Sequence, residues 1–205
     1  LVELDRLQPP SITIVGGTAT ITAQVEEQLE RRYPDADVRR IAGSDRYETA
    51  ALIATEVFGS AETAFVASGE VFPDALSASG VAAAIGDAPV LLSGREALPD
   101  ATAEALHDLE VEQAWIIGGR ASLAYAVVVD ARMETGGAER IGGADRYETN
   151  ALLVERFVEL EQPQGLVIAT GAGFPDALSA SAIVGATGDP LLLAVGTCTT
   201  APVTA

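Results

Sequence analysis

The sequence contains no lysine, and its 205 residues include only one histidine, His107, and one cysteine, Cys198. A single cysteine excludes a disulfide framework within the chain and a cysteine metal cluster. With one residue of each kind, most zinc sites and the Ser-His or Cys-His pairs of nucleophilic catalysis are nearly excluded. His107 lies in a helical pattern at 103–109, where a solvated surface position is the simpler interpretation. We therefore expect neither a metal nor a cofactor.

Basic residues and long apolar segments are also scarce. All 12 basic residues are arginines, and they face 30 acidic residues, which gives a formal net charge of −18. Such a surface repels the phosphates of nucleic acids, so no nucleic-acid partner is expected. The composition suits a chain kept soluble in high salt, and it equally suits a GC-rich genome that replaces lysine by arginine. No run of 18 apolar residues is present, so we expect no membrane span.

The sequence is organised around a segment that occurs twice. Phe-Pro-Asp-Ala-Leu-Ser-Ala-Ser stands at 72–79 and returns unchanged at 174–181, which is 102 positions later. A second motif, at 40–49, returns at 140–149 with Asp-Arg-Tyr-Glu-Thr intact, here 100 positions later. The drift between 100 and 102 places small insertions in loops, where they are tolerated. Two periods of about 102 residues account for the whole chain and indicate a tandem array.

Each period predicts four strands separated by helices. Short apolar segments alternate with helical patterns, and Asp45 and Glu48 have the spacing of a capping box at a helix start. The expected strands of the first period are 11–15, 38–43, 64–67 and 89–92. Strands separated by helices form parallel sheets with right-handed crossovers, so the fold class is α/β, in tandem Rossmann-like parallel-sheet modules of about 100 residues. We expect one module over 1–110 and a second over 111–205 that lacks its last helix.

Polar residues gather at one edge of the expected sheets. Loops that follow parallel strands meet at the carboxyl edge, so the Asp-Arg-Tyr and Phe-Pro-Asp loops are expected to meet there. The candidate binding residues are Arg40, Arg46, Tyr47 and Asp74, with their copies Arg140, Arg146, Tyr147 and Asp176. An arginine beside an aspartate could hold a sugar or a phosphate, with Tyr47 as a stacking face, or it could form an ion pair that fixes two helix starts. Nothing in this set resembles an activated nucleophile or a matched acid–base pair.

Two glycine loops and two helices of small residues leave alternatives open. Segments 16–18 and 118–120 each join a strand to a helix, a place where phosphates bind, yet neither contains a recognised phosphate motif. An enzyme that uses these Gly-Gly loops to bind a small molecule or sugar phosphate is the alternative function, and a strand-to-helix turn is the simpler interpretation. The helices at 75–85 and 177–187 are rich in Ala, Ser and Gly, which suits either a buried core or a contact between modules.

The motifs, taken in order, resemble a known family. Arg-Ile-x-Gly-x-Asp-Arg-Tyr-Glu-Thr, Ser-Gly-x-x-Phe-Pro-Asp-Ala-Leu-Ser-Ala, Pro-x-Leu-Leu and Ile-Ile-Gly-Gly follow one another over about 100 residues and recur in both periods. This order is similar to the type 2 cell wall-binding repeat. In the register of that family the chain holds a repeat tail over 1–38, one full repeat over 39–138 and a repeat head over 139–205. In the second copy, Ser68-Gly69 is replaced by Thr170-Gly171.

The resemblance implies a function that composition alone does not reveal. Repeats of this family are non-catalytic and anchor a secreted surface protein, as in S-layers, to the cell wall by binding an anionic wall polymer. They usually come in threes, packed about a pseudo-threefold, beside an enzyme or adhesin domain. The chain would then be part of a longer protein, with the wall polymer and its neighbouring repeats as partners. Alternatively, these modules only pack together, and the wall contact lies in another repeat.

The net charge of −18 stands against an anionic ligand, because the overall field repels it. Three arrangements resolve this conflict. Arg40, Arg46, Arg140 and Arg146 could form a local basic spot, a divalent cation could bridge carboxylates to polymer phosphates, or high salt could screen the repulsion. The sequence leaves these three open.

Overall fold

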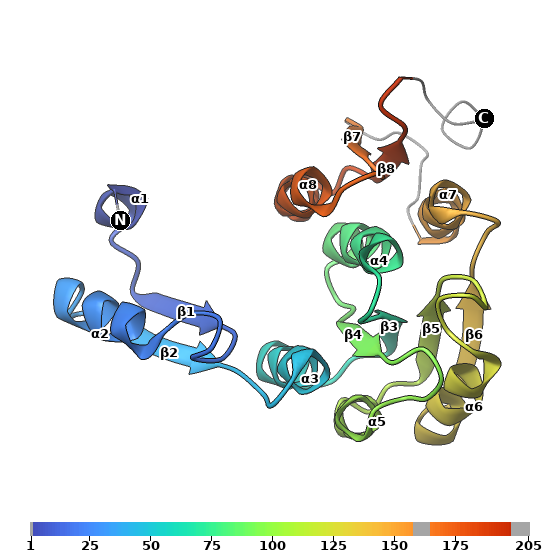
Figure 1. Cartoon of the computed structure of the whole chain (residues 1–205), viewed down its shortest axis with the longest axis horizontal. Helices are drawn as coiled ribbons and strands as arrows, with labels where there is room; N and C mark the ends of the chain where they lie inside the picture. Colours follow the sequence, from blue (N-terminus) through green and yellow to red (C-terminus); the bar gives the residue numbers. More distant parts are fainter. Residues whose placement is uncertain (1, 158–164, 198–205) are drawn as a thin grey trace.

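Helices and parallel strands alternate along the chain in this computed structural model, which describes residues 2–157 and 165–197 (Figure 1). The strands are β1 (Ser11–Val15), β2 (Asp37–Ile41), β3 (Thr63–Ser68), β4 (Val90–Ser93), β5 (Gln113–Ile117), β6 (Gly137–Ile141), β7 (Val167–Thr170) and β8 (Leu191–Ala194). The helices are α1 (Val2–Leu7), α2 (Ala23–Arg32), α3 (Arg46–Val57), α4 (Phe72–Ile85), α5 (Asp100–Asp108), α6 (Tyr125–Glu134), α7 (Arg146–Phe157) and α8 (Phe174–Thr187). The predicted α/β alternation in both periods is confirmed.

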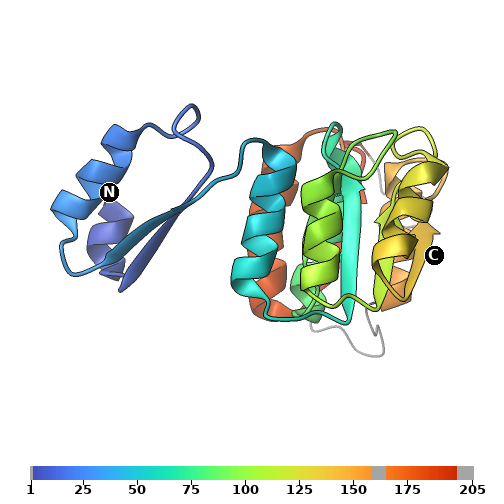
Figure 2. The ribbon, with the colours of Figure 1, turned by 90° about the horizontal axis from the view of Figure 1, so that it is seen from below.

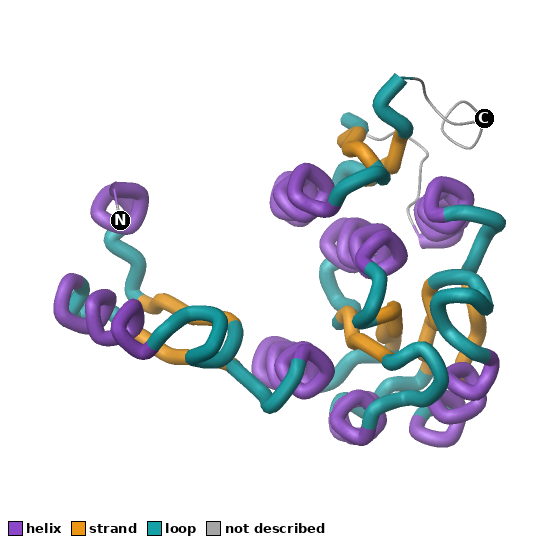
Figure 3. Tube along the Cα trace, in the orientation of Figure 1, coloured by secondary structure: helices purple, strands orange, loops and turns teal. Residues whose placement is uncertain are grey.

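The central unit is a four-stranded parallel sheet of order β4-β3-β5-β6. Val66 of β3 lies opposite Ile116 of β5, and both are fully buried because helices cover both faces of the sheet (Figure 3). Helices α3, α5 and α6 pack on the face that carries Val66, and α4 and α7 pack on the face that carries Phe65 and Ile117. This unit therefore contains the main core of the protein.

The central sheet crosses the division expected at residue 110. Strands β3 and β4 lie before this position and pair with β5 and β6, which lie after it. A unit counted from α3 to β6, over 46–141, keeps all four strands together. As folding modules, 1–110 and 111–205 remain a prediction, and a cut between them would divide a continuous sheet.

Two-stranded sheets flank the central unit in sequence. Strands β1 and β2, with α2 beside them, are the repeat counterparts of β5 and β6; β7 and β8 are the counterparts of β3 and β4. Figures 1 and 2 place β1, β2 and α2 apart from the central unit, to which residues 42–45 join them. Each of these sheets is thus one half of the sheet that is complete in the middle.

The helices of small residues serve both roles that the sequence left open. Ala78 and Val81 of α4 lie in the central core, while Leu76 of the same helix packs with α8. A Cβ atom on Gly80 would lie 3.1 Å from the Leu191 side chain, so glycine permits a close approach to β8. Helix α4 is therefore the joint between the central unit and the one that follows.

Within the described residues, no helix combines the length and apolarity that a membrane crossing requires.

Candidate functional site

Three loops at the carboxyl edge of the central sheet surround a cleft of about 540 Å³. They follow β3, β5 and β6, as the parallel topology requires. The cleft is lined by Glu70, Val71, Phe72, Pro73, Asp74, Gly119, Ala121, Ser122, Gly143, Ala144, Asp145, Arg146 and Thr149. An Asp-Arg-Tyr loop and a Phe-Pro-Asp loop thus meet at this edge, but they come from different repeats, at α7 and α4, and not from the same repeat as the sequence predicted.

Asp74, in the first turn of α4, joins two of these loops. Asp74 is only 8% exposed, and its Oδ2 accepts a hydrogen bond of 3.0 Å from the Ser122 hydroxyl. Burial raises the pKa of the Asp74 carboxyl, while the Ser122 hydrogen bond and the charges of Arg146 and Arg140 oppose this rise. A Cβ atom on Gly118 would collide with Oδ2. Asp74 therefore fills the space beside the Gly-Gly loop that follows β5.

Arg140 and Arg40 hold the Gly-Gly loops in place. Arg140 donates from Nη1 to the Gly118 carbonyl at 2.7 Å and from Nη2 to the Ala124 carbonyl at 3.0 Å. Arg40 donates from Nη1 to the Gly16 carbonyl at 2.6 Å and makes a 2.9 Å ion pair with Glu26. Burial, and next the charge of Arg120, lower the pKa of the Arg140 guanidinium. The guanidinium groups of both arginines are therefore bonded to other groups of the chain, mainly to carbonyls of the Gly-Gly loops.

In each repeat, an Arg-Tyr pair ties the start of a helix to the glycine that follows the next strand along the chain. Arg46 donates from Nη1 to the Gly69 carbonyl at 2.5 Å, and Arg146 makes the same bond to Gly171 at 2.6 Å. The rings of Tyr47 and Tyr147 lie against Gly69 and Gly171, where a Cβ atom would come within 2.5 Å of each ring. Both arginines therefore have a structural contact, but the predicted partner was wrong: each guanidinium bonds a backbone carbonyl, and no ion pair joins it to an aspartate among the described residues.

The helix starts themselves form as the sequence indicates. The Asp45 carboxylate accepts hydrogen bonds from the amides of Tyr47 and Glu48 at 2.8 and 2.9 Å. Asp145 makes the same pair of bonds at the start of α7. Their capping role is thus observed in both copies, and it presents the Asp145 side chain at the rim of the cleft.

The structure brings only part of the candidate set together. Arg146 and Asp74 line the cleft, and Arg140 lies close enough to alter the Asp74 pKa. Arg46 lines a second hollow of about 530 Å³, over 16–20 and 43–49, whose described lining includes no Phe-Pro-Asp residue. Asp176 is exposed in the first turn of α8. Identical motifs therefore occupy different surroundings in the two repeats.

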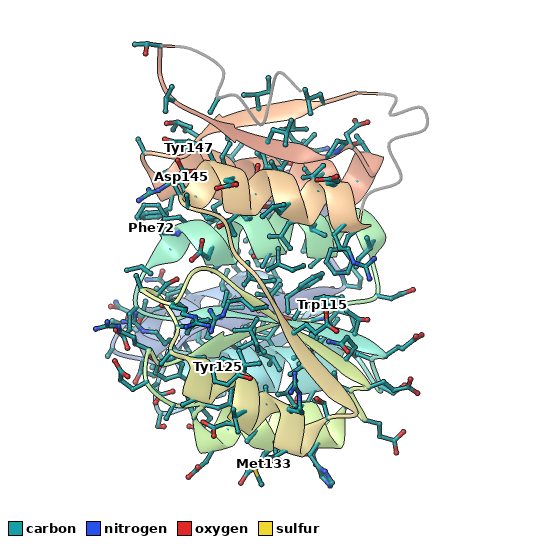
Figure 4. All side chains as sticks on the ribbon, turned by 90° about the vertical axis from the view of Figure 1, so that its right-hand side faces the viewer. Phe72, Trp115, Tyr125, Met133, Asp145 and Tyr147 are labelled. Carbon is teal, nitrogen blue, oxygen red and sulfur yellow. The ribbon has the colours of Figure 1, made fainter. Side chains whose placement is uncertain are left out.

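Two phenylalanines that the sequence interpretation did not include stand beside the cleft. Phe72 and Phe174, both exposed, are edge to face with ring centroids 5.8 Å apart. The Arg146 guanidinium carbon lies 5.8 Å from the centre of the Phe72 ring. Figure 4 shows Phe72 and Asp145 on the same side of the molecule, with Met133 at the far end. The duplicated octapeptide contained this signal, because an aromatic residue opens both copies.

Replacing Asp74 by asparagine is expected to change how stability depends on pH. Because burial holds the folded pKa above the ordinary value of 3.8, the wild-type protein gains stability as pH falls through the folded pKa, and the gain is complete below 3.8. Asp74→Asn removes the charge and keeps an oxygen that accepts from Ser122, so this gain should be absent. Urea unfolding from neutral to acid pH measures it.

The control for this prediction is Asp176→Asn, the same position in the second repeat. Asp176 is exposed, so this variant should keep the wild-type dependence on pH. Parallel stability profiles of Asp74→Asn and the wild-type protein would contradict the assigned cause, since the buried charge would then contribute nothing.

The fold and the clefts at its sheet edges define a tandem array of Rossmann-like α/β modules. The chain belongs to the family described as Cell wall binding domain 2 (CWB2), whose model matches residues 40–128 and again 140–204. The family predicted from the repeated motifs is confirmed.

Sequence relatives include two proteins of Bacillus subtilis (strain 168). The chain is 33% identical to the Amidase enhancer over 176 residues, which cover 86% of this chain and 23% of that protein. It is 26% identical to N-acetylmuramoyl-L-alanine amidase LytC over 153 residues, which cover 69% of this chain and 31% of the amidase. The chain thus spans less than a third of either relative.

Two solved structures are similar over nearly the whole chain. Cwp6 from Clostridium difficile matches with a TM-score of 0.88 and 27% identity, over 99% of this chain and 32% of that one. Cwp8 from Clostridium difficile matches with a TM-score of 0.79 and 27% identity, over 94% of this chain and 33% of that one.

Proposed function

We propose that this chain is a non-catalytic module that anchors a secreted surface protein non-covalently to the cell wall by binding an anionic wall polymer. The observation that carries this proposal is the match of the CWB2 family to both repeats, together with the cleft where their loops meet. Both amidase-related relatives are more than three times longer than the matched segment, which leaves room in them for catalysis elsewhere.

The lining of the cleft carries both charges, because Arg146 stands there with Glu70, Asp74 and Asp145. Arg146 lines the cleft, and the charges of Arg120 and Arg140 are close enough to influence each other. Two of the three arrangements that the sequence left open therefore suit this cleft: a basic spot at Arg146 with Arg140 and Arg120 beside it, or a divalent cation that bridges the carboxylates to the polymer. The exposed ring of Phe72 adds an apolar wall on which a sugar ring can pack. A polymer that combines sugars with negative groups suits this lining.

The same geometry disfavours an enzyme that uses the Gly-Gly loops. The Asp74 carboxylate lies against Gly118, where a phosphate would meet a negative charge. Helix α6 begins only at Tyr125, so the Gly118-Gly119 turn is separated from its N-terminus. A loop that is filled and distant from a helix dipole makes a poor phosphate cradle.

Neighbouring repeats form the second partner in this proposal. The contact of Leu76 with the α8 core supports direct packing of successive units, and we propose that further repeats continue it about a pseudo-threefold. Because the proposed ligand lies outside the membrane, we propose that the protein is secreted and located at the cell wall.

Co-sedimentation with bacterial cell walls tests the function. Binding should disappear after acid extraction of the anionic polymers and should weaken as salt rises. Arg146→Ala should weaken it about tenfold or more, because a hydrogen bond to a charged group contributes roughly 1.5–3 kcal/mol. Phe72→Ala, at an exposed position, provides a second variant whose fold should stay intact.

The matched control is Arg156→Ala, at the other end of the same helix. It removes the same charge, yet Arg156 packs on Trp115, away from the cleft lining. An equal loss in both arginine variants would mean that the overall field binds the wall and the cleft does not. Absence of binding to either wall preparation at any salt concentration would refute anchoring by these repeats.

A further inference from the structure

The guanidinium of Arg120 has no hydrogen bond and no ion pair among the described residues. Nearly all of the 12 arginines donate to a carboxylate or a backbone carbonyl, and Arg156, the other exception, lies over the rings of Trp115 and Phe157. Arg120 lies 6.0 Å from the centre of the Tyr125 ring, its one partner within that part of the chain. In a protein of net charge −18, a cation without a carboxylate partner is free to bind an external anion.

The Arg120–Tyr125 pair is exposed, yet it stands on a fixed loop. Tyr125, which begins α6 and is labelled in Figure 4, is 56% exposed, and Arg120 is exposed as well. The preceding residue, Ala124, accepts from Arg140 Nη2 at 3.0 Å, and its amide donates to the Arg95 carbonyl at 2.7 Å. A contact surface that is held in place before binding loses little conformational entropy when a ligand arrives.

A second arginine strengthens the positive field beside this pair. After burial, the charge of Arg120 is the next cause that lowers the pKa of the Arg140 guanidinium, while the charge of Asp74 raises it. The two guanidinium groups therefore repel each other. An anion bound at Arg120 would relieve this repulsion, which points to a ligand with a negative group.

The pair is not needed for the fold of its loop. At an offset of 102 the counterparts of Arg120 and Tyr125 are Thr18 and Ala23. The first repeat forms the same glycine turn and the same helix start with these small residues. Both members of the pair also lie within 46–141, the unit whose four-stranded sheet is complete. Their type and their exposure are thus better explained by a ligand than by packing.

A similar arginine–aromatic pair lines the cleft itself. The Arg146 guanidinium carbon lies 5.8 Å from the centre of the Phe72 ring, and both residues belong to the lining. Gly119 and Ala121, on either side of Arg120 in sequence, line the same cleft. Two such pairs beside one cleft suit a polymer in which charged sugars repeat, because the ring packs on the aromatic face and the charge pairs with arginine.

We propose that Arg120 and Tyr125 form a second subsite, which binds one anionic sugar unit of the polymer. The sugar ring packs on the exposed part of the Tyr125 ring, and its carboxylate or phosphate accepts hydrogen bonds from the Arg120 guanidinium. This inference rests on the proposed binding of a wall polymer and adds a contact that the preceding repeat, with Thr18 and Ala23, does not offer. Repeats of one array therefore differ in the ligand contacts that they contribute.

An NMR titration of the purified chain tests the subsite with three probes: glucuronic acid, a glucose monophosphate and glucose. One or both acids should shift the backbone amide signals of 119–125 and the Arg120 Nε–H signal, and glucose should bind about tenfold more weakly or less. A shift with glucuronic acid alone assigns a carboxylate, and a shift with the phosphate alone assigns a phosphate. Absence of a shift with either acid would overturn the subsite.

Variants of the pair give the matched comparison. Arg120→Ala and Tyr125→Ala should each weaken binding of the acid by about tenfold, whereas Tyr125→Phe should keep it, because the ring remains. Arg31→Ala removes the same charge from an exposed position of α2 and should bind like the wild-type protein. Both members of the pair are exposed, so their variants should fold.

The titration needs no cell wall, so a failure of the subsite and a failure of wall anchoring are distinguishable. In co-sedimentation, Arg120→Ala and Tyr125→Ala should each reduce wall binding. A loss with Arg146→Ala but none with these two variants would leave anchoring in place and overturn the subsite. An equal loss with Arg31→Ala would also overturn it, since the overall charge would then be the cause.

Discussion

Gly118→Ala is expected to destabilise the protein by about 2–6 kcal/mol. Gly118 has a φ of +116°, a region in which a side chain costs ~1–3 kcal/mol. In addition, the new methyl group would collide with the Asp74 carboxylate and approach the Ser122 hydroxyl, and overpacking of this kind costs ~1–3 kcal/mol. Chemical denaturation of the variant and the wild-type protein measures the difference.

Gly16→Ala separates these two causes, because Gly16 is the same position in the first repeat. Its φ of +105° carries the same backbone strain, but the nearest atom to an added methyl group is in Thr20, at 3.8 Å. We expect a loss of only about 1–3 kcal/mol there. Equal losses in both variants would show that Asp74 moves aside freely and does not fix the loop.

Asn150→Ala is expected to cost about 2–4 kcal/mol. The Asn150 amide nitrogen donates to the Leu191 carbonyl at 3.1 Å, and its oxygen accepts from the Leu193 amide at 2.8 Å, all within buried residues. Alanine leaves both backbone groups of β8 without these partners, and each unsatisfied group costs ~1–3 kcal/mol. Thermal unfolding should register the loss, and hydrogen exchange should locate it at the Leu193 amide.

The matched change is Ala50→Asn, in the counterpart position of α3. Ala50 and Leu92 line an open hollow, so water can reach this edge of β4. The corresponding edge of β8 is buried. We expect this reverse substitution to alter stability by less than about 1 kcal/mol. A large effect at Ala50 with a small one at Asn150 would contradict the burial argument.

The repeat predicted most of the fold. Apolar segments placed the strands, and Asp45 with Glu48 placed a helix start that the structure confirms. The period did not predict which strands share a sheet. A boundary between repeats can be placed at any point of a periodic sequence, and each choice groups the strands differently. The pairing of β3 with β5 across residue 110 is a tertiary choice that depends on which helices cover each face.

The site was less predictable for a related reason. Sequence spacing brought Arg146 to the sheet edge, but it could not distinguish a guanidinium that faces a ligand from one that bonds a carbonyl such as Gly171. Asp74 and Asp176 stand in identical octapeptides, yet one is buried against Ser122 and the other is exposed. The difference comes from the unit that packs against each octapeptide, and the residues of the octapeptide do not reveal that unit.

The duplication of the half-sheet also affects how the chain folds. The edge of β3 that pairs with β5 could equally accept β1, since Ser11 and Gln113 lie about equally far from Thr63 along the chain and the entropy of loop closure favours neither. What separates the competing strands is their side chains: β5 brings Trp115 and Ile117 to the face under α4 and α7, whereas β1 brings Thr13 and Val15. Tandem repeats are prone to misassembly of this kind. The differences between the two repeats, rather than their likeness, therefore direct each strand to its own sheet.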